Sequence, residues 1–377
     1  MAKAPLSVET QPPPILRSRM PELDTLRGIA ILAVVFYHAL YLVKDYSLYP
    51  RLIQLGMQSM WLGRLGVNLF FVLSGFLITG ILLESRGRTG YYRRFYIHRA
   101  LRIFPAYFLL IAALFLLAYP AKFLVLSVLY LSNLAPLFGI GVAYPILWSL
   151  AVEEHFYLVW PWLANRLAAR GLGILTLAIV VLSPAVRWFS FSWSVPEGVG
   201  KYTVYDFTWN SADGLACGAL LAIALREFPS SRKRLWQWTA LVAAAAAAIW
   251  LVGAPLGILT RQTQFGAAMQ IVPWNFFFVA VLLAFLLIGT SESRALVQIP
   301  LLMFYGEISY GLYLYHLLVI RGYDWATSDG LWRGAISSPT LLLALRFLSV
   351  MLVATGAAWF SRRFYEDKFL KLKSKFS

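Results

Sequence analysis

The sequence has little charge and almost no cysteine. Asp, Glu, Lys and Arg make up 13% of its 377 residues and hydrophobic residues 60%, a composition that excludes an ordinary soluble enzyme of this length. Its single cysteine, Cys217, excludes a disulfide within the chain, and we expect it to be a small packing residue. The four histidines lack metal-ligand spacing, so we expect no metal site. The remaining interpretation is a polytopic membrane protein.

Acidic residues are scarce relative to basic ones, at 17 against 33. In a soluble protein this excess would suggest nucleic acid as a partner. Here the basic residues lie in short loops between apolar runs, where they indicate orientation in a membrane, and we expect no nucleic-acid partner. Residues 1–20 also lack the apolar core of a secretory signal, so we expect the first apolar run to target the chain and to stay in the membrane.

Ten apolar runs are long enough to cross a bilayer as helices. They cover residues 25–43, 64–83, 103–119, 147–164, 171–188, 208–225, 236–253, 272–289, 301–320 and 340–359. An eleventh run, 123–138, is interrupted by Asn133 and Pro136, and we predict that it is a re-entrant or interfacial segment. The predicted fold class is therefore an all-α polytopic membrane protein, a bundle of about ten transmembrane helices.

Basic segments indicate the orientation of the bundle. Residues 84–102, 231–234 and 361–375 are rich in Arg or Lys, and the positive-inside rule places them, with both termini, on the cytoplasmic side of the cell inner membrane. Two ends on one side require an even number of spans, which agrees with ten. The predicted domains are a cytoplasmic tail at 1–23, a transmembrane domain at 24–360 and a basic cytoplasmic tail at 361–377.

Ionisable groups inside apolar runs are costly, so they are candidates for function. Arg27 and His38 lie eleven residues apart in the first run and share one helix face, with Arg27 nearer the cytoplasm. Taken alone, a helix histidine is more often a packing residue than a catalyst. In the fourth run Glu153 follows Ser149 by four residues on a common face, and we favour a functional role for this carboxylate.

Two later runs also carry polar side chains. Ser309, Tyr313 and His316 fall at i, i+4 and i+7, which makes a polar stripe on an otherwise apolar helix. Asp213 enters the sixth run beside small residues that permit close helix approach. A histidine partnered by a carboxylate can act as a general base toward a hydroxyl or take an acyl group itself as a nucleophile, and both remain open.

The basic segment 84–102 contains arginine but no lysine, and it ends with Arg99 and Arg102 on one helix face. Lysine would serve topology equally well, whereas the planar guanidinium binds phosphate with two parallel hydrogen bonds. We therefore favour phosphate binding over plain topology. This layout suits a phosphate-bearing donor on the cytoplasmic side and a hydroxyl acceptor reached from the other side.

Five motifs, in order, resemble the acyltransferase-3 family of membrane-bound O-acyltransferases. They are LDTLRGIAILAVVFYH with Arg27 and His38, GVNLFFVLSGFLITG, RALRIFPAYF with Arg99 and Arg102, WSLAVEEHFYLVWP with Ser149 and Glu153, and GEISYGLYLYH ending at His316. The resemblance implies transfer of an acyl group, usually acetyl, from cytoplasmic acyl-CoA to a hydroxyl of an extracytoplasmic saccharide or glycoconjugate. It also implies that Arg99 and Arg102 hold the CoA phosphates, that His38 is the essential histidine, and that no cofactor is bound permanently.

The predicted site has three parts. The catalytic residues are His38, Glu153 and His316; the donor is held by Arg27, Arg99 and Arg102; the substrate-binding residues are Ser149, Asp213, Ser309 and Tyr313. The chain departs from the family at Ser211, where an arginine often stands, and at His155, where glutamine is common.

Some relatives carry a fused extracytoplasmic hydrolase-like domain that completes transfer. This sequence shows none, so we expect direct acylation of the acceptor or hand-over to a separate extracytoplasmic partner enzyme. The alternative function is a transporter or flippase for an anionic solute or lipid-linked glycan, with the arginines as an entry funnel and the histidines as a proton relay.

Overall fold

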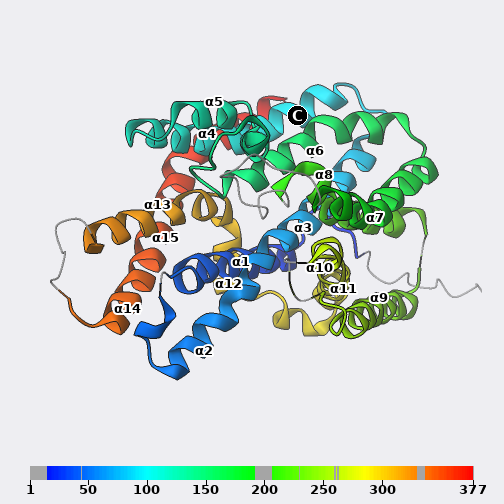
Figure 1. The fold of residues 1–377 in the computed structure, drawn as a ribbon. Coiled ribbons are helices and arrows are strands. Elements are labelled where there is room, and N and C mark those ends of the chain that lie inside the picture. The colour runs from blue at the N-terminus through cyan, green and yellow to red at the C-terminus, as the bar shows by residue number, and fades with distance from the viewer. Residues whose placement is uncertain are drawn as a thin grey trace, which may run out of the picture.

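The protein folds into a bundle of helices (Figure 1). The computed structural model describes residues 15–43, 45–191, 206–228, 230–258, 260, 263–328 and 336–376. Within those ranges the regular structure is helical, with no β-strand. The prediction of an all-α membrane protein is confirmed at this level.

Long helices coincide with the predicted apolar runs. They are α1 (Pro21–Phe36), α3 (Gly66–Ser85), α4 (Tyr91–Leu116), α6 (Leu147–Arg166), α7 (Ala169–Phe191), α8 (Thr208–Glu227), α9 (Arg232–Gly253), α11 (Val272–Gly289), α13 (Ser309–Ser328) and α14 (Pro339–Ser349). A π-helical turn at Tyr37–Tyr41 extends α1. Another at Val350–Ala354 connects α14 to α15 (Thr355–Phe360). Shorter helices are α2 (Arg51–Ser59), α5 (Ala121–Val128), α10 (Gln264–Met269), α12 (Pro300–Glu307) and α16 (Asp367–Leu370).

Seven helical stretches in the described ranges are long and apolar enough to cross a membrane. They are Pro21–Tyr41, Arg51–Ser85, Tyr91–Leu116, Ala169–Phe191, Arg232–Gly253, Gln264–Gly289 and Pro339–Lys375. The other three predicted spans correspond to α6, α8 and α13, each 20 residues long. Each of these three helices carries a candidate site residue within its span: Glu153, Asp213 and His316, respectively.

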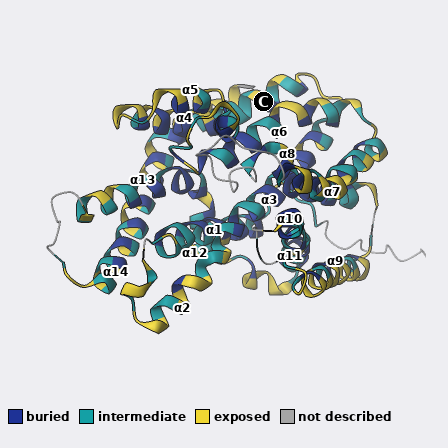
Figure 2. Cartoon of the chain, viewed as in Figure 1, coloured by how far each residue is buried: buried dark blue, intermediate teal, exposed yellow. Residues whose placement is uncertain are grey.

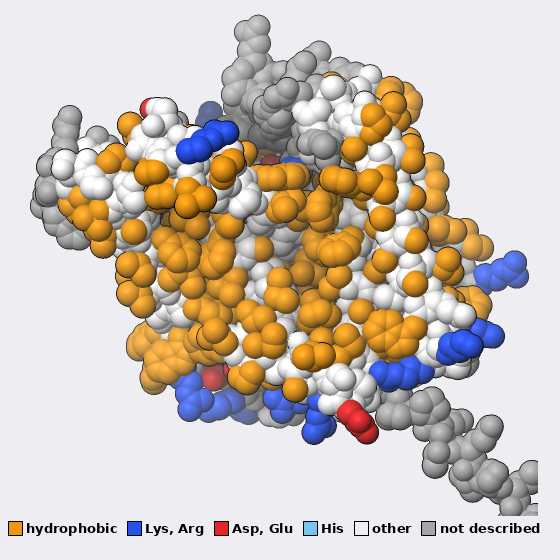
Figure 3. All heavy atoms as spheres, turned by 90° about the horizontal axis from the view of Figure 1, so that it is seen from below, with side chains coloured by type: hydrophobic (Ala, Val, Ile, Leu, Met, Phe, Trp, Pro, Cys, Tyr) orange, Lys and Arg blue, Asp and Glu red, His pale blue; other side chains and the backbone are white. Residues whose placement is uncertain are grey.

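The distribution of apolar and charged side chains on the surface is typical of a membrane protein. Figure 3 shows hydrophobic side chains spread as a broad band across one lateral face, with Lys and Arg gathered mainly along its lower edge. Buried residues concentrate at the centre of the bundle, in α1, α3, α6 and α8 (Figure 2). The chain is therefore a multi-pass membrane protein with a closely packed interior.

Glycines allow the closest helix contacts. A Cβ on Gly218 of α8 would lie 1.9 Å from the Val72 carbonyl oxygen of α3, and one on Gly75 would lie 1.9 Å from the Leu215 carbonyl oxygen. Only a residue without a side chain fits at these two positions, as is common where membrane helices cross closely. The small residues around Asp213 therefore serve close packing, as predicted.

Three segments differ from the simplest interpretation of the apolar pattern. The run 301–320 is not one helix, because the chain breaks at Ile308 between α12 and α13. Residues 44–63, expected to be a loop, contain α2. The run 123–138 forms α5 and a separate 3-10 turn at Ser132–Phe138, and an eight-residue α-helix is only about 12 Å long.

Candidate active site

Two histidines from distant parts of the chain meet in the core. His38 lies in the π-helical turn that extends α1, and His316 lies in the middle of α13. Their closest nitrogens, Nδ1 of His38 and Nε2 of His316, are 3.2 Å apart, and His316 is fully buried. The structure thus joins the ends of two polar stripes that the sequence places on separate helices.

Backbone acceptors assign the tautomer of each ring. His316 Nδ1 lies 3.0 Å from the Leu312 carbonyl oxygen, so it carries the proton and leaves Nε2 as an acceptor. His38 Nδ1 lies 3.0 Å from the Val34 carbonyl oxygen and therefore donates both to that oxygen and to His316 Nε2. This arrangement leaves His38 Nε2 unprotonated, and no described residue hydrogen-bonds to it. His38 Nε2 is thus a free base.

An ion pair holds the end of the His38 helix. Arg346 of α14 donates to both carboxylate oxygens of Asp324 in α13, at 2.8 and 2.9 Å. The same guanidinium also donates to the carbonyl oxygens of Ala39 and His38. Carbonyl groups at a helix C-terminus lack partners within the helix, and an arginine satisfies them well. Arg346 therefore ties the His38 turn to the helix that carries His316.

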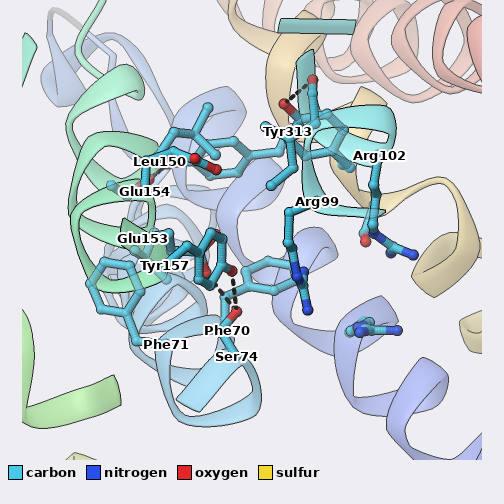
Figure 4. Close-up of a pocket in the computed structure, with 16 residues that line it drawn as sticks. Phe70, Phe71, Ser74, Arg99, Arg102, Leu150, Glu153, Glu154, Tyr157 and Tyr313 are labelled. Carbon is cyan, nitrogen blue, oxygen red and sulfur yellow. Dashed lines mark hydrogen bonds between the residues drawn. The ribbon is translucent and has the colours of Figure 1, made fainter. Parts of the chain in front are cut away.

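A cavity lies between the arginines and Tyr313, and neither His38 nor His316 is among its described lining residues. The described residues that line it include all three predicted donor-binding arginines, Arg27, Arg99 and Arg102, and the predicted polar residues Ser149, Glu153, Ser309 and Tyr313. Figure 4 shows Arg99 and Arg102 reaching in from one side, with Ser74, Glu153 and Tyr157 on the other. Seven of the ten predicted site residues therefore share one cavity.

Glu153 belongs to a small network on the side of the cavity that faces Arg99. Its carboxylate accepts a hydrogen bond of 2.6 Å from Ser74, and Tyr157 donates to the Ser74 hydroxyl at 3.4 Å. The guanidinium carbon of Arg99 lies 4.9 Å from the centre of the Tyr157 ring. Glu153 thus bonds to Ser74 rather than to His38, contrary to the pairing of carboxylate and histidine that the sequence suggested.

The stripe on α13 connects the cavity with the histidines. Tyr313 and Ser149 share a hydrogen bond of 2.6 Å, and the Tyr313 and His316 rings are 5.9 Å apart between centres. Ser309, one turn before Tyr313, donates to the Gly306 carbonyl at 2.8 Å. Ser309 and Tyr313 therefore line the cavity, and Tyr313 brings its wall next to His316, which lies outside the lining.

Two wider cavities adjoin the first on its arginine side. Arg27 and Arg102 line both of them, and Arg99 lines one. Their volumes are about 270 and 540 Å³, against about 100 Å³ for the inner cavity, so only the outer spaces can take a bulky group. Arg27 also pairs with Asp24 at 3.0 Å, whereas Arg99 and Arg102 form no hydrogen bond or ion pair with any described residue.

Asp213 lies elsewhere. Its carboxylate pairs at 2.8 Å with Arg187 of α7, and both residues are buried. Arg187 also donates to the backbone carbonyls of Asn210 and Ala268. Asp213 does not line the inner cavity, so its role as a substrate-binding residue stays a prediction, and the geometry favours a structural one.

Sequence reasoning missed several residues around the site. Tyr157 follows Glu153 by four residues, a helical spacing that could have revealed it. Arg346 and Arg187 are charged residues inside apolar runs, the criterion that selected His38 and Glu153, and they could have been found in the same way. Ser74 gave no such signal, because a lone serine in an apolar run is common.

Comparisons with known proteins agree with the motifs. A family described as an acyltransferase domain matches residues 20–363. The peptidoglycan O-acetyltransferase OatA of Listeria monocytogenes is 26% identical over 95% of this chain and 60% of its own length. A Staphylococcus aureus protein, SAS0844, named as a candidate O-acetyltransferase, is 27% identical over 80% of this chain and 50% of its own. The chain thus spans about half to three fifths of these relatives. No solved structure matches.

Proposed function

The chain belongs to the acyltransferase-3 family, and from this membership we propose that it is a membrane O-acetyltransferase. It moves an acetyl group from acetyl-CoA on the cytoplasmic side to a hydroxyl of an extracytoplasmic saccharide or glycoconjugate. One observation carries the proposal: a single cavity runs from the unpaired cations Arg99 and Arg102 to the stripe that ends at the His38–His316 pair.

The arginines suit a polyanionic donor. Two guanidinium groups without a hydrogen bond or ion pair to the described residues, at the mouth of a narrow cavity, are costly unless an anion binds there, and arginine binds phosphate in a planar, two-pronged geometry. The wide outer spaces have room for a nucleotide, and the narrow inner cavity has room for a slim thioester arm. Acetyl-CoA has this combination of a phosphate-bearing head and a thin arm. It acts as a substrate, not as a permanently bound cofactor.

His38 is proposed as the general base. Its free Nε2 takes the proton of the acceptor hydroxyl, the hydroxyl oxygen attacks the thioester carbonyl carbon, the carbon–sulfur bond breaks, and the proton passes to the departing CoA thiolate. His316 accepts the Nδ1–H of His38 and so holds the ring in the required tautomer. The same nitrogen could carry the acetyl group transiently, and a hydroxylamine-sensitive acyl-enzyme would identify that route.

The remaining site residues act on either side of this centre. Glu153, which bonds to Ser74 beside Arg99, is proposed to shape the donor end of the cavity. Ser149, Ser309 and Tyr313 line the path to His316 and are proposed to orient the reacting groups. Arg27 is proposed to support the donor, because it lines all three cavities.

The proposal includes a membrane topology. We propose ten spans with both termini in the cytoplasm, with α6, α8 and α13 as the three that hydropathy alone does not select, and with residues 123–138 re-entrant or interfacial. Arg19 near the start of the chain and Arg362 near its end line one cavity, which supports placing both ends on one side. The proposed membrane is the cell inner membrane, with the transmembrane domain at 24–360.

The acceptor is proposed to be a cell-envelope saccharide, because the Listeria relative is named for O-acetylation of peptidoglycan. A separate extracytoplasmic enzyme that completes transfer to the saccharide is a proposed partner. A transporter or flippase, the alternative, would move its solute without cleaving a thioester.

Transfer of radiolabelled acetyl from acetyl-CoA to envelope saccharides tests the proposal. Membranes with wild type are expected to label saccharide, whereas those with His38→Ala or Arg99→Ala/Arg102→Ala are expected to show only background. Arg166→Ala/Arg170→Ala is the matched control, because it removes two arginines that line none of the three cavities. Equal labelling by wild type and His38→Ala, at equal expression, would contradict the proposal.

A further inference from the structure

One face of α4 forms most of a cavity beside the inner site. Its residues recur at helical spacing, and α3 and the C-terminal segment complete the walls. The lining residues are Tyr91, Arg94, Phe95, His98, Arg99 and Arg102 of α4, Leu77, Ile81 and Ser85 of α3, Arg27 of α1, and Lys373. The sequence motif covered only the last two arginines of this stripe.

The charge of this cavity has one sign. Five cations line it, namely Arg27, Arg94, Arg99, Arg102 and Lys373, and none of its described lining residues is acidic. The neighbouring outer cavity differs, because Asp24 and Glu307 line it together with its arginines. A multiply charged anion is therefore favoured in the first cavity over the second.

The C-terminal segment is part of this wall. Residues Lys371–Phe376 form a 3-10 turn against α4, and His98 Nε2 lies 3.3 Å from the Lys373 carbonyl oxygen. This contact holds the backbone of Lys373 while its side chain lines the cavity. The predicted cytoplasmic tail at 361–377 thus reaches the donor side of the site.

The cations of the cavity fall into two sets, one near the inner cavity and one further out. Coenzyme A has its phosphates in the same two positions, the diphosphate next to the thioester arm and the 3′-phosphate further away. Arg27, Arg99 and Arg102 line both this cavity and the inner one, so they are closest to the thioester arm and would meet the diphosphate that follows it. Arg94 and Lys373 line this cavity alone. Beyond the diphosphate the donor carries a ribose with a 3′-phosphate and an adenine.

We propose that Arg94 and Lys373 bind the ribose 3′-phosphate of the donor, an inference that rests on the proposed function. Tyr91 and Phe95 line the same space and offer aromatic surfaces to the adenine. His98 is a positioning residue, because its contact with the Lys373 backbone fixes the segment. The subsite makes the enzyme selective for coenzyme A over dephospho-CoA, which lacks only this phosphate.

Equilibrium titration of the purified full-length protein with CoA and with dephospho-CoA tests the subsite. Wild type is expected to bind CoA about tenfold more tightly than dephospho-CoA, which corresponds to the loss of one charge-assisted contact. Lys373→Gln and Arg94→Gln are each expected to weaken CoA alone and so reduce this ratio toward one. Lys375→Gln, an exposed lysine two residues away that lines no described cavity, is expected to keep the wild-type ratio.

Other outcomes of the titration would contradict either the subsite alone or the donor proposal as well. A wild-type ratio of one, or Lys373→Gln and Arg94→Gln that both keep the wild-type ratio, overturns the subsite and leaves the donor proposal standing. Equal weakening of both ligands by both variants also overturns it, because the residues would then not recognise the 3′-phosphate. Wild type that binds neither ligand overturns the donor proposal together with the subsite.

Discussion

At the scale of single residues, the proposed chemistry depends on which nitrogen of His38 carries the proton. The neutral ring has one donor and one acceptor, and the Val34 carbonyl and His316 both call for a donor at Nδ1. A backbone carbonyl alone holds a ring loosely, since it fixes only one direction. His316 supplies a second acceptor from another helix and thereby fixes the plane of the His38 ring.

Replacing His316 by Phe removes that acceptor and keeps an aromatic ring of similar size. We expect kcat to fall about 10- to 100-fold with KM for acetyl-CoA unchanged, as is typical when a group that orients a reacting ring is lost. His316→Gln, which restores an acceptor, is expected to recover part of the rate. Initial rates at varied acetyl-CoA measure both constants. A raised KM at unchanged kcat would instead place His316 in donor binding.

Helical spacing predicted which polar residues share a helix face but not which faces meet. Ser309, Tyr313 and His316 were expected to form one stripe, and they do follow one another from the cavity to the core. The contact between His38 and His316 joins residues 278 positions apart, and no periodicity within a helix encodes it. The same limit explains why Glu153 was paired with a histidine when its partner is Ser74.

At the scale of elements, the π-helical turn at Tyr37–Tyr41 places His38 at the end of α1. Such turns are rare and frequently occur at functional sites, because the wider turn leaves carbonyl groups to be satisfied from outside. Arg346 satisfies two of them and is bound in turn by Asp324. The position of His38 therefore depends on α14 as well as on its own helix.

Arg346→Gln is expected to lower kcat at least tenfold while KM for acetyl-CoA stays the same, because the His38 turn loses its anchor and the donor cavity is untouched. Arg346→Lys, which keeps the charge but not the two-pronged geometry, should fall in between. Arg363→Gln is the matched control, since this arginine is exposed and lies on the same terminal helical stretch. Measuring kcat and KM for acetyl transfer by the three variants tests this expectation. Equal rates for Arg346→Gln and the control would contradict it.

Close packing of α3 and α8 gives a prediction for stability. Gly218→Ala places a methyl group 1.9 Å from a backbone oxygen, which forces the helices apart and is expected to cost about 1–3 kcal/mol. Gly356→Ala in α15 is the control, because nothing lies within 4 Å of its Cβ and alanine favours a helix. Thermal unfolding of the purified variants should show a lower melting temperature for Gly218→Ala alone. Equal melting temperatures would show that the helices relax without cost.

Apolar runs predicted the positions of the long helices well, because a span must be both long and apolar. They did not predict the break at Ile308, although Gly306 and Glu307 interrupt the apolar run directly before it. The break has a tertiary cause: α12 packs directly on α1, and a Cβ on Gly306 would lie 1.9 Å from the Asp24 carbonyl oxygen. The boundary therefore coincides with both a local Gly306–Glu307 pair and a close contact with another helix.

At the scale of the whole molecule, residues near both ends of the described part of the chain line the arginine cavities. Arg19 and Arg362 line one of them, and Lys373 lines the other. The positive-inside rule considers such residues only as signals of orientation. In the proposed topology these residues have a second role, because the cations also form the surface that a cytoplasmic polyanion would meet.

This arrangement predicts which residues an impermeant thiol reagent reaches in intact cells stripped of their outer envelope. The only cysteine, Cys217, is buried, so a Cys217→Ala background suits single-cysteine labelling. Ser47, Ser18 and Ser374 are exposed. With ten spans and cytoplasmic ends, Ser47→Cys is expected to label at once, whereas Ser18→Cys and Ser374→Cys should label only after the membrane is opened. Labelling of Ser374→Cys but not of Ser18→Cys without opening would require an odd number of spans, and labelling of both would reverse the orientation. Either result would place Lys373 and the arginine cavity opposite the cytoplasmic donor.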